Sequence, residues 1–162
     1  MKSKLIFIGI IILTFLVLII IYSRFVGTSG LKIKEYPIKD NKIPSHFHGL
    51  KIVHISDIHF NKVINEKRII ELVKRINDLD ADIIVFTGDL VDHDIDKEKQ
   101  AFLSKALSDM KGKLGKYMVS GNHDLEVDSY SKIIADSDFI NLDNNFELIY
   151  FNEIEPIIIS GI

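Results

Sequence analysis

The chain contains no cysteine and no tryptophan, and only three of its 162 residues are proline. Without cysteine it has no disulfide framework, no thiolate metal site and no thiol nucleophile. It also lacks the Gly-x-Ser-x-Gly, Walker and Gly-x-Gly-x-x-Gly patterns, which argues against serine hydrolases, P-loop enzymes and dinucleotide-binding enzymes. With 47% hydrophobic residues, the chain is too apolar to remain disordered.

Positive charge is not in excess either. The 20 lysines and arginines are outnumbered by 23 aspartates and glutamates, which gives a net charge of −3. When residues 1–22 are set aside, 18 basic and 23 acidic residues remain, a net charge of −5. A nucleic-acid-binding surface is therefore not expected, and the length predicts a single domain.

Charged residues are absent from Leu5 to Ile21, and only Gly9 and Thr14 interrupt this apolar run. As a helix, residues 5–22 would be about 27 Å long, close to the ~30 Å of a bilayer core, and apolar on every face. We predict an uncleaved transmembrane anchor at residues 1–22, because the run exceeds the ~7–15 residues of a signal-peptide core and no A-x-A site follows. A cleaved signal peptide and a buried core helix are the alternatives.

The flanks of this run bear on its orientation. Lys2 and Lys4 favour a cytoplasmic N-terminus, although Arg24, Lys32 and Lys34 lie on the other flank. We therefore expect a single-pass protein of the cell membrane, with the lipid bilayer as a partner and its domain outside the cytoplasm.

The rest of the chain divides into a linker with an edge strand, residues 23–48, and a domain, residues 49–162. Partial alternation of apolar and lysine residues predicts the edge strand at Leu31–Ile38, limited by Pro37. From residue 51 on, apolar strand patterns alternate with amphipathic helix patterns, which predicts an α/β fold with a largely parallel sheet. The predicted strands are Lys51–Ile55, Asp82–Thr87 and Tyr117–Ser120, the predicted helices are Glu66–Leu79, Lys97–Met110 and Ser129–Ala135, and Phe146–Phe151 with Pro156–Ser160 is the predicted hairpin.

Residue types that bind metals follow each of the three predicted parallel strands. Asp57 and His59 follow the first strand, Asp89 the second, and Asn122 and His123 the third. Ligands of open α/β sheets bind at the carboxyl ends of the strands, and carboxylate, imidazole and amide oxygen suit Mn, Fe or Zn. Each motif alone is weak, since Gly-Asp after a strand is most often a loop or a helix cap. Three motifs in order, at spacings of 32 and 33 residues, predict one metal site.

The spacing also suggests roles for these residues. In an extended chain, Asp57 and His59 would point to the same side and could hold one ion. Asp89 follows a glycine, and its two carboxylate oxygens could bridge two ions about 3.5–4 Å apart. Asn122 could ligate without adding charge, which leaves His123 free as an acid.

Three blocks resemble the first signature motifs of the calcineurin-like metallophosphoesterases: Asp57-x-His59, Gly88-Asp89-x-x-Asp92 and Gly121-Asn122-His123-Asp124. The stretch 49–59 is similar to the membrane-anchored bacterial phosphodiesterase-type branch. The resemblance implies an α/β/β/α sandwich that hydrolyses phosphodiester or phosphomonoester bonds at a dinuclear metal centre.

The resemblance also implies how that centre is built. Asp57 and His59 would hold one ion, Asp89 would bridge, Asn122 would hold the other ion, and His123 would be the acid that faces the phosphate. We expect Asp92 and Asp124 to cap the loops or to orient these ligands, and His54, inside the first strand, to be packed in the core.

The chain departs from the family pattern in its histidines. The family completes its site with one further histidine and then a Gly-His-x-His block, whereas none of the six histidines here follows His123. We therefore expect a truncated first half of the sandwich, in which the second ion has only Asp89 and Asn122 as ligands. The alternative function is a non-catalytic membrane-anchored fragment with an incomplete metal site. We predict weak binding of one metal, negligible phosphodiesterase activity and a tendency to aggregate.

Overall fold

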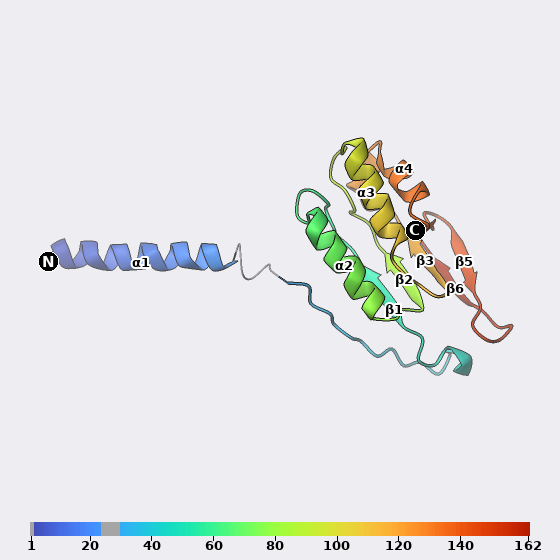
Figure 1. The fold of residues 1–162 in the computed structure, drawn as a ribbon. Helices are drawn as coiled ribbons and strands as arrows, with labels where there is room; N and C mark the ends of the chain where they lie inside the picture. Colours follow the sequence, from blue (N-terminus) through green and yellow to red (C-terminus); the bar gives the residue numbers. More distant parts are fainter. Residues whose placement is uncertain (1, 24–29) are drawn as a thin grey trace. The chain divides into compact units, whose positions relative to one another are not determined.

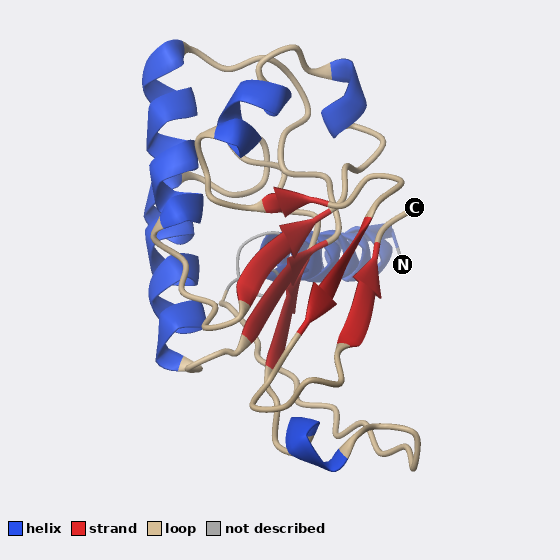
Figure 2. Cartoon of the chain, turned by 90° about the vertical axis from the view of Figure 1, so that its right-hand side faces the viewer, coloured by secondary structure: helices blue, strands red, loops and turns tan. Residues whose placement is uncertain are grey.

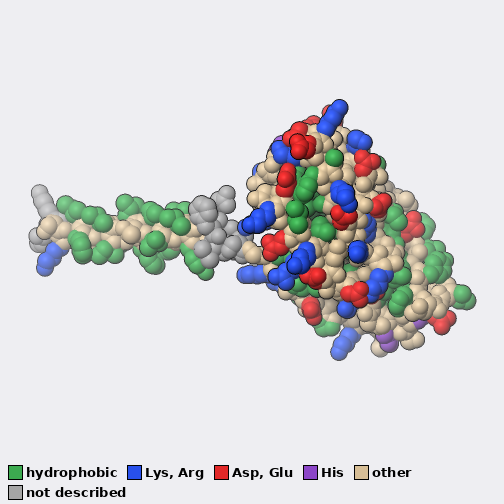
Figure 3. Space-filling model, in the orientation of Figure 1, with side chains coloured by type: hydrophobic (Ala, Val, Ile, Leu, Met, Phe, Trp, Pro, Cys, Tyr) green, Lys and Arg blue, Asp and Glu red, His purple; other side chains and the backbone are tan. Residues whose placement is uncertain are grey.

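The computed structural model describes residues 2–23 and 30–162, and the chain forms two compact units, residues 1–38 and 39–162 (Figure 1). The first unit contains helix α1 (Lys2–Tyr22). Hydrophobic side chains line this helix along its length (Figure 3), and those from Ile6 to Tyr22 are exposed. No helix among the described residues is long and apolar enough to cross a membrane.

The edge strand predicted in the linker is wrong. Residues 31–38 have no strand structure, and each of them is exposed. The segment pairs with no strand of the described chain, and Pro37 has no N–H with which to join a ladder. Residues 24–29 of the predicted linker lie outside the described residues.

The second unit is built on a four-stranded parallel sheet in the order β1-β2-β3-β4. The strands are β1 (Ile52–Ile55), β2 (Ile83–Phe86), β3 (Gly115–Met118) and β4 (Ile140–Asn141). Ile55 pairs with Phe86, and Phe86 pairs with Met118, so the first three strands end level with one another. The predicted α/β fold with a parallel sheet is confirmed, although β4, with only two residues, was not predicted.

One face of this sheet is covered by helices α2 (Glu66–Asp78), α3 (Lys97–Ser108) and α4 (Tyr130–Ala135) (Figure 2). The helices α2 and α3 begin where Asn65 and Asp96 accept backbone N–H groups of their first turns, which satisfies donors that the helix cannot satisfy itself. Ile69 and Leu103 are fully buried in the resulting core. This layer fixes the sheet from one side and leaves the carboxyl ends of its strands free.

The other face is partly covered by an antiparallel hairpin of β5 (Phe146–Ile149) and β6 (Ile157–Ser160), which confirms the predicted hairpin. Ile149 and Ile159 pack with Ile83 and Tyr117 in a second, smaller core, to which the short helix η2 (Ser45–Phe47) adds a buried phenylalanine. The outer face of the hairpin is apolar and exposed at Phe146, Leu148 and Ile158.

The expectation that His54 is packed in the core is wrong. Its side chain is exposed, and its Nε2 shares a hydrogen bond of 2.7 Å with the hydroxyl of Thr87. The hairpin packs over β2 and β3 and leaves this face of β1, including Ile52, uncovered. Alternation along a strand gives the side of the sheet a residue takes, but not whether another layer covers that side.

Candidate metal centre

The loops that follow β1 and β2 continue the parallel pairing of their strands. The N–H of Asp57 donates to the carbonyl of Gly88 at 3.0 Å, and the N–H of His59 donates to the carbonyl of Asp89 at 2.9 Å. The loop after β3 joins them, because the N–H of His123 donates to Oδ1 of Asp89 at 3.2 Å. All three sequence motifs therefore meet at the carboxyl edge of the sheet.

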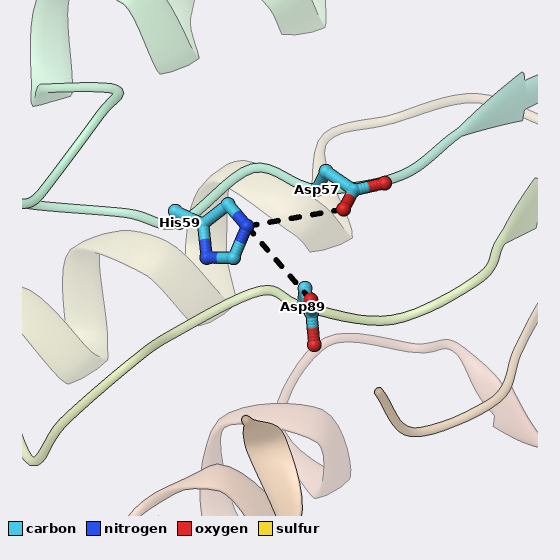
Figure 4. A group of neighbouring side chains, drawn as sticks. All are labelled: Asp57, His59 and Asp89. Carbon is cyan, nitrogen blue, oxygen red and sulfur yellow. Dashed lines mark ion pairs between the residues drawn. The ribbon is translucent and has the colours of Figure 1, made fainter. Parts of the chain in front are cut away.

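Asp57, His59 and Asp89 point toward one another at this edge (Figure 4). The Nε2 atom of His59 lies 3.8 Å from Oδ1 of Asp57 and 3.8 Å from Oδ2 of Asp89. Each of the three offers one ligand atom, and these atoms lie within 4.8 Å of one another. The side chains of His59 and Asp89 are 19% and 16% exposed, against 69% for Asp57, so the group is open to solvent on one side.

The backbone at all three residues is left-handed. Their φ angles are 55° at Asp57, 44° at His59 and 59° at Asp89, a region that costs a residue with a side chain about 1–3 kcal/mol. Asp57 and His59 therefore converge through two left-handed residues, and the extended chain assumed from their spacing is wrong. Strained residues of this kind persist where the surrounding hydrogen bonds hold them, and they cluster at functional sites.

Asp92 connects the nitrogen-bearing side chains of the site. Its carboxylate, 5% exposed, lies 3.0 Å from Nδ1 of His59, 3.0 Å from Nζ of Lys62 and 3.5 Å from Nδ1 of His123. Burial raises the pKa of Asp92, but the hydrogen bond from Lys62 and the charge of His59 outweigh it, so that this pKa lies below its ordinary value. Because Asp92 takes Nδ1, it leaves Nε2 of His59 facing Asp57 and Asp89, the arrangement found in metal-binding histidines.

His123 lies beside this group and is more exposed. Its ring meets that of His59 edge-on, with centroids 5.4 Å apart, and its side chain is 41% exposed. The short helix η3 (Asp124–Glu126) begins directly after it.

Asn122 is exposed. Its two neighbours in the chain, Gly121 and His123, both have backbone atoms against Asp89. Asp124 is buried and bonds to the backbone of both loops.

The donor set fits a divalent cation. Two carboxylates and an imidazole nitrogen are ligands that Mn, Fe and Zn accept. When His59 is neutral, its Nε2 and the facing oxygens of Asp57 and Asp89 are all acceptors, so a cation among them removes their mutual repulsion. The two oxygens of Asp89 face different neighbours, Oδ2 toward His59 and Oδ1 toward the loop after β3.

Two side chains of this region were not predicted from the sequence. Lys62 donates to Asp92, and its only sequence signal is its position three residues after His59. Asp143 accepts the N–H of Ser120 at 2.8 Å and also its hydroxyl. It follows β4, and the two residues of that strand are too few to give a strand pattern.

Comparison with known proteins gives a consistent result. The sequence model of the family described as calcineurin-like phosphoesterase matches residues 50–160, which is more than half of the chain and contains every residue of the candidate site.

Individual relatives are similar over part of their length. An uncharacterised metallophosphoesterase of Aquifex aeolicus is 36% identical over 101 residues, 62% of this chain and 37% of that protein. A transmembrane protein with metallophosphoesterase domain of Danio rerio is 33% identical over 93 residues, 57% of this chain and 21% of that protein. A UDP-2,3-diacylglucosamine pyrophosphatase of Chlamydia muridarum is 34% identical over 80 residues, 49% of this chain and 24% of that protein. The chain thus spans between about a fifth and two fifths of these relatives.

Proposed function

Since the chain belongs to the calcineurin-like phosphoesterase family, whose members are hydrolases, we propose that it takes part in metal-dependent hydrolysis of phosphoester bonds. The observation that carries the proposal is the convergence of Asp57, His59 and Asp89 within 4.8 Å at one edge of the sheet. The proposed fold is the first part of an α/β/β/α sandwich, with residues 1–22 as an anchor, 23–48 as a linker and 49–162 as the hydrolase domain.

The proposed ligands of a first divalent ion are Asp57, His59 and Asp89, and those of a second are Asp89 and Asn122. The orientation of Asp89 between two loops supports its place in both sets. Ions of this kind polarise phosphoryl oxygens and lower the pKa of water.

Two further side chains, Asp92 and His123, have roles in this proposal. Asp92 holds the Nδ1 proton of His59 and thereby keeps Nε2 free. His123 holds a proton for the leaving oxygen of the substrate, because its ring is at the open side of the site and Asp92 is 3.5 Å from its Nδ1. A positioned acid of this kind typically contributes ~10²–10⁴-fold to a rate.

A second candidate function is binding of one metal without turnover. The observation that favours it is that the metal-binding side chains found together in the described part of the chain are Asp57, His59 and Asp89, which form one group, whereas Asn122 is exposed. With the second position mostly empty at ordinary metal concentrations, the leaving oxygen would lose its cationic partner.

One experiment separates the two functions. The full chain in mild detergent is titrated with Mn²⁺ and assayed on bis-p-nitrophenyl phosphate, on p-nitrophenyl phosphate and on a pyrophosphate-linked nucleotide, with Asp89→Asn as the control. Metal binding with turnover that the variant abolishes supports the hydrolase, and metal binding without turnover supports the second candidate. Absence of metal binding contradicts both. The pyrophosphate substrate is included because one relative is named a pyrophosphatase.

We further propose that α1 attaches the chain to a membrane, with the domain on the extracytoplasmic side. Support comes from the absence of charged residues between Leu5 and Ile21, from the exposed apolar side chains of α1, and from relatives named as transmembrane proteins. Carbonate extraction should leave the chain in the membrane pellet, and protease added to intact cells or spheroplasts should cleave the domain. Release of the intact chain by carbonate would contradict attachment, and protection from protease would contradict the orientation.

A further inference from the structure

Asp124 is the most completely bonded carboxylate of the site region. It is 1% exposed, and its oxygens accept four backbone N–H groups. The N–H groups of Asp89, Leu90 and Val91 donate at 2.8, 2.8 and 3.1 Å, and that of Gly121 donates at 2.9 Å. Three donors thus come from the loop after β2 and one from the loop after β3, so a single buried side chain ties the two loops together.

These bonds leave Asp124 no capacity to act as a metal ligand. A carboxylate offers about four lone-pair positions, and four N–H donors fill them. Asp124 is also outside the group of ligand atoms formed by Asp57, His59 and Asp89. Any effect of Asp124 on the metal site therefore acts through the backbone to which it is bonded.

The backbone it holds is that of Asp89. The N–H of Asp89 donates to Oδ2 of Asp124 while the residue has a left-handed φ of 59°, a conformation that few residues with side chains adopt without support. The Oδ1 atom of Asp89 in turn accepts the N–H of His123. Asp89 is therefore fixed at its amide by Asp124 and at its carboxylate by the neighbour of Asp124.

The two loops also touch directly through glycines. A Cβ on Gly88 would collide with the backbone of Gly121, and a Cβ on Gly121 would collide with the backbone nitrogen and Oδ1 of Asp89. The carboxylate of Asp89 thus lies against bare backbone, and the spacing of the loops decides where its oxygens are.

We propose that Asp124 is a positioning residue that sets the metal affinity of the site by holding the loops after β2 and β3 together and so fixing the carboxylate of Asp89. The proposal rests on the proposed function, because it requires that Asp89 is a metal ligand.

The test compares two carboxylates that brace the same loop from different sides. Asp124→Asn replaces an acceptor of four N–H groups by an amide whose NH₂ group faces donors. Asp143→Asn is the matched control, because Asp143 also holds this loop through Ser120 but does not bond to Asp89. Mn²⁺ affinity is measured by electron paramagnetic resonance on the full chain in detergent, at a temperature where thermal unfolding in EDTA finds both variants folded.

Asp124→Asn should weaken Mn²⁺ binding at least tenfold, the size of loss seen when groups that orient ligands are removed, whereas Asp143→Asn should weaken it less than threefold. A role confined to stability would lower the unfolding temperature in EDTA without this difference in affinity. Wild-type affinity in folded Asp124→Asn, or an equal loss in both variants, would overturn the proposal.

A second variant keeps the proposal testable if Asp124→Asn does not fold. Gly121→Ala keeps the carboxylate of Asp124 and places a methyl group against Asp89, so it too should weaken Mn²⁺ binding at least tenfold. Unchanged affinity there would overturn the idea that the loop spacing sets the affinity. If the wild-type chain itself binds no Mn²⁺, the proposed function fails, which is a different result from either of these.

Discussion

At the scale of single residues, the carboxylate of Asp92 lies among the two histidines and the lysine of the site. It bonds to His59 and Lys62, and His123 lies 3.5 Å away. Asp92→Asn should weaken Mn²⁺ binding by about 10–100-fold, the usual cost of removing a carboxylate that orients a metal-binding histidine. Isothermal titration of the full chain in detergent measures the change.

The matched control for this change lies two residues along the chain. Asp94 accepts the N–H of Ser129 and does not bond to His59, so Asp94→Asn should leave Mn²⁺ affinity within a factor of two of the wild type. Equal losses in the two variants would mean that Asp92 acts through general stability and not through His59.

The lowered pKa of Asp92 also predicts how stability depends on pH. Burial opposes the shift, but Lys62 and His59 lower the pKa below its ordinary value of 3.8, so the folded chain releases this proton more readily than the unfolded chain. Ionised Asp92 therefore stabilises the fold at pH values above 3.8, and this contribution is lost as the pH falls through 3.8 toward the folded pKa. Urea midpoints measured in EDTA from pH 6 to pH 3 should fall more steeply for the wild type than for Asp92→Asn. If the midpoints of the two proteins fall in parallel, ionised Asp92 does not stabilise the fold.

At the scale of elements, the burial of neighbouring residues shows which side of helix α2 faces the sheet. Ile69 is fully buried and Ile70 is 60% exposed, although the two are neighbours with identical side chains. Ile69→Ala should lower the free energy of unfolding by about 2–5 kcal/mol, whereas Ile70→Ala should change it by no more than about 0.5 kcal/mol. Urea unfolding of both variants measures the difference, and similar losses would show that α2 is packed on a different face.

The sequence predicts these elements well where periodicity is strong. The ranges of α2, α3, β1 and β2 differ from prediction by no more than two residues at either end, because each combines an apolar pattern with a clear cap or turn. Periodicity could not predict β4, which has two residues, nor reject the strand at residues 31–38, because strand formation needs a partner that no local pattern specifies.

The candidate site, like the fold, could be predicted from the sequence only in part. The residue types at Asp57, His59 and Asp89 were predicted from their positions after strands, but their left-handed backbones were not. Asp and His adopt this conformation more readily than most residues, yet most Asp and His residues do not adopt it, so the residue type alone does not predict it. Lys62 was missed for a similar reason, since a lone lysine three residues from a histidine has no pattern of its own.

At the scale of the whole molecule, apolar surface remains exposed in both units. Beyond α1, the outer face of the β5–β6 hairpin presents Phe146, Leu148 and Ile158, the last 68% exposed, and uncovered apolar surface promotes association. Ile158→Lys should reduce the aggregated fraction in detergent, measured by size-exclusion chromatography with light scattering. Ser160→Lys is the control, because it adds the same charge on this strand without removing an apolar side chain. An equal effect of both changes would assign the result to charge alone.

The central claim is that Asp57, His59 and Asp89 form a binding site for a divalent metal in a chain of the calcineurin-like phosphoesterase family. The most direct measurement is a Mn²⁺ titration of the full chain in detergent, followed by electron paramagnetic resonance, with wild type and Asp89→Asn compared side by side. The account predicts that the wild type binds at least one Mn²⁺ and that Asp89→Asn binds at least tenfold more weakly while remaining folded. A wild type that binds no Mn²⁺, or a folded variant that binds it equally well, would contradict the account.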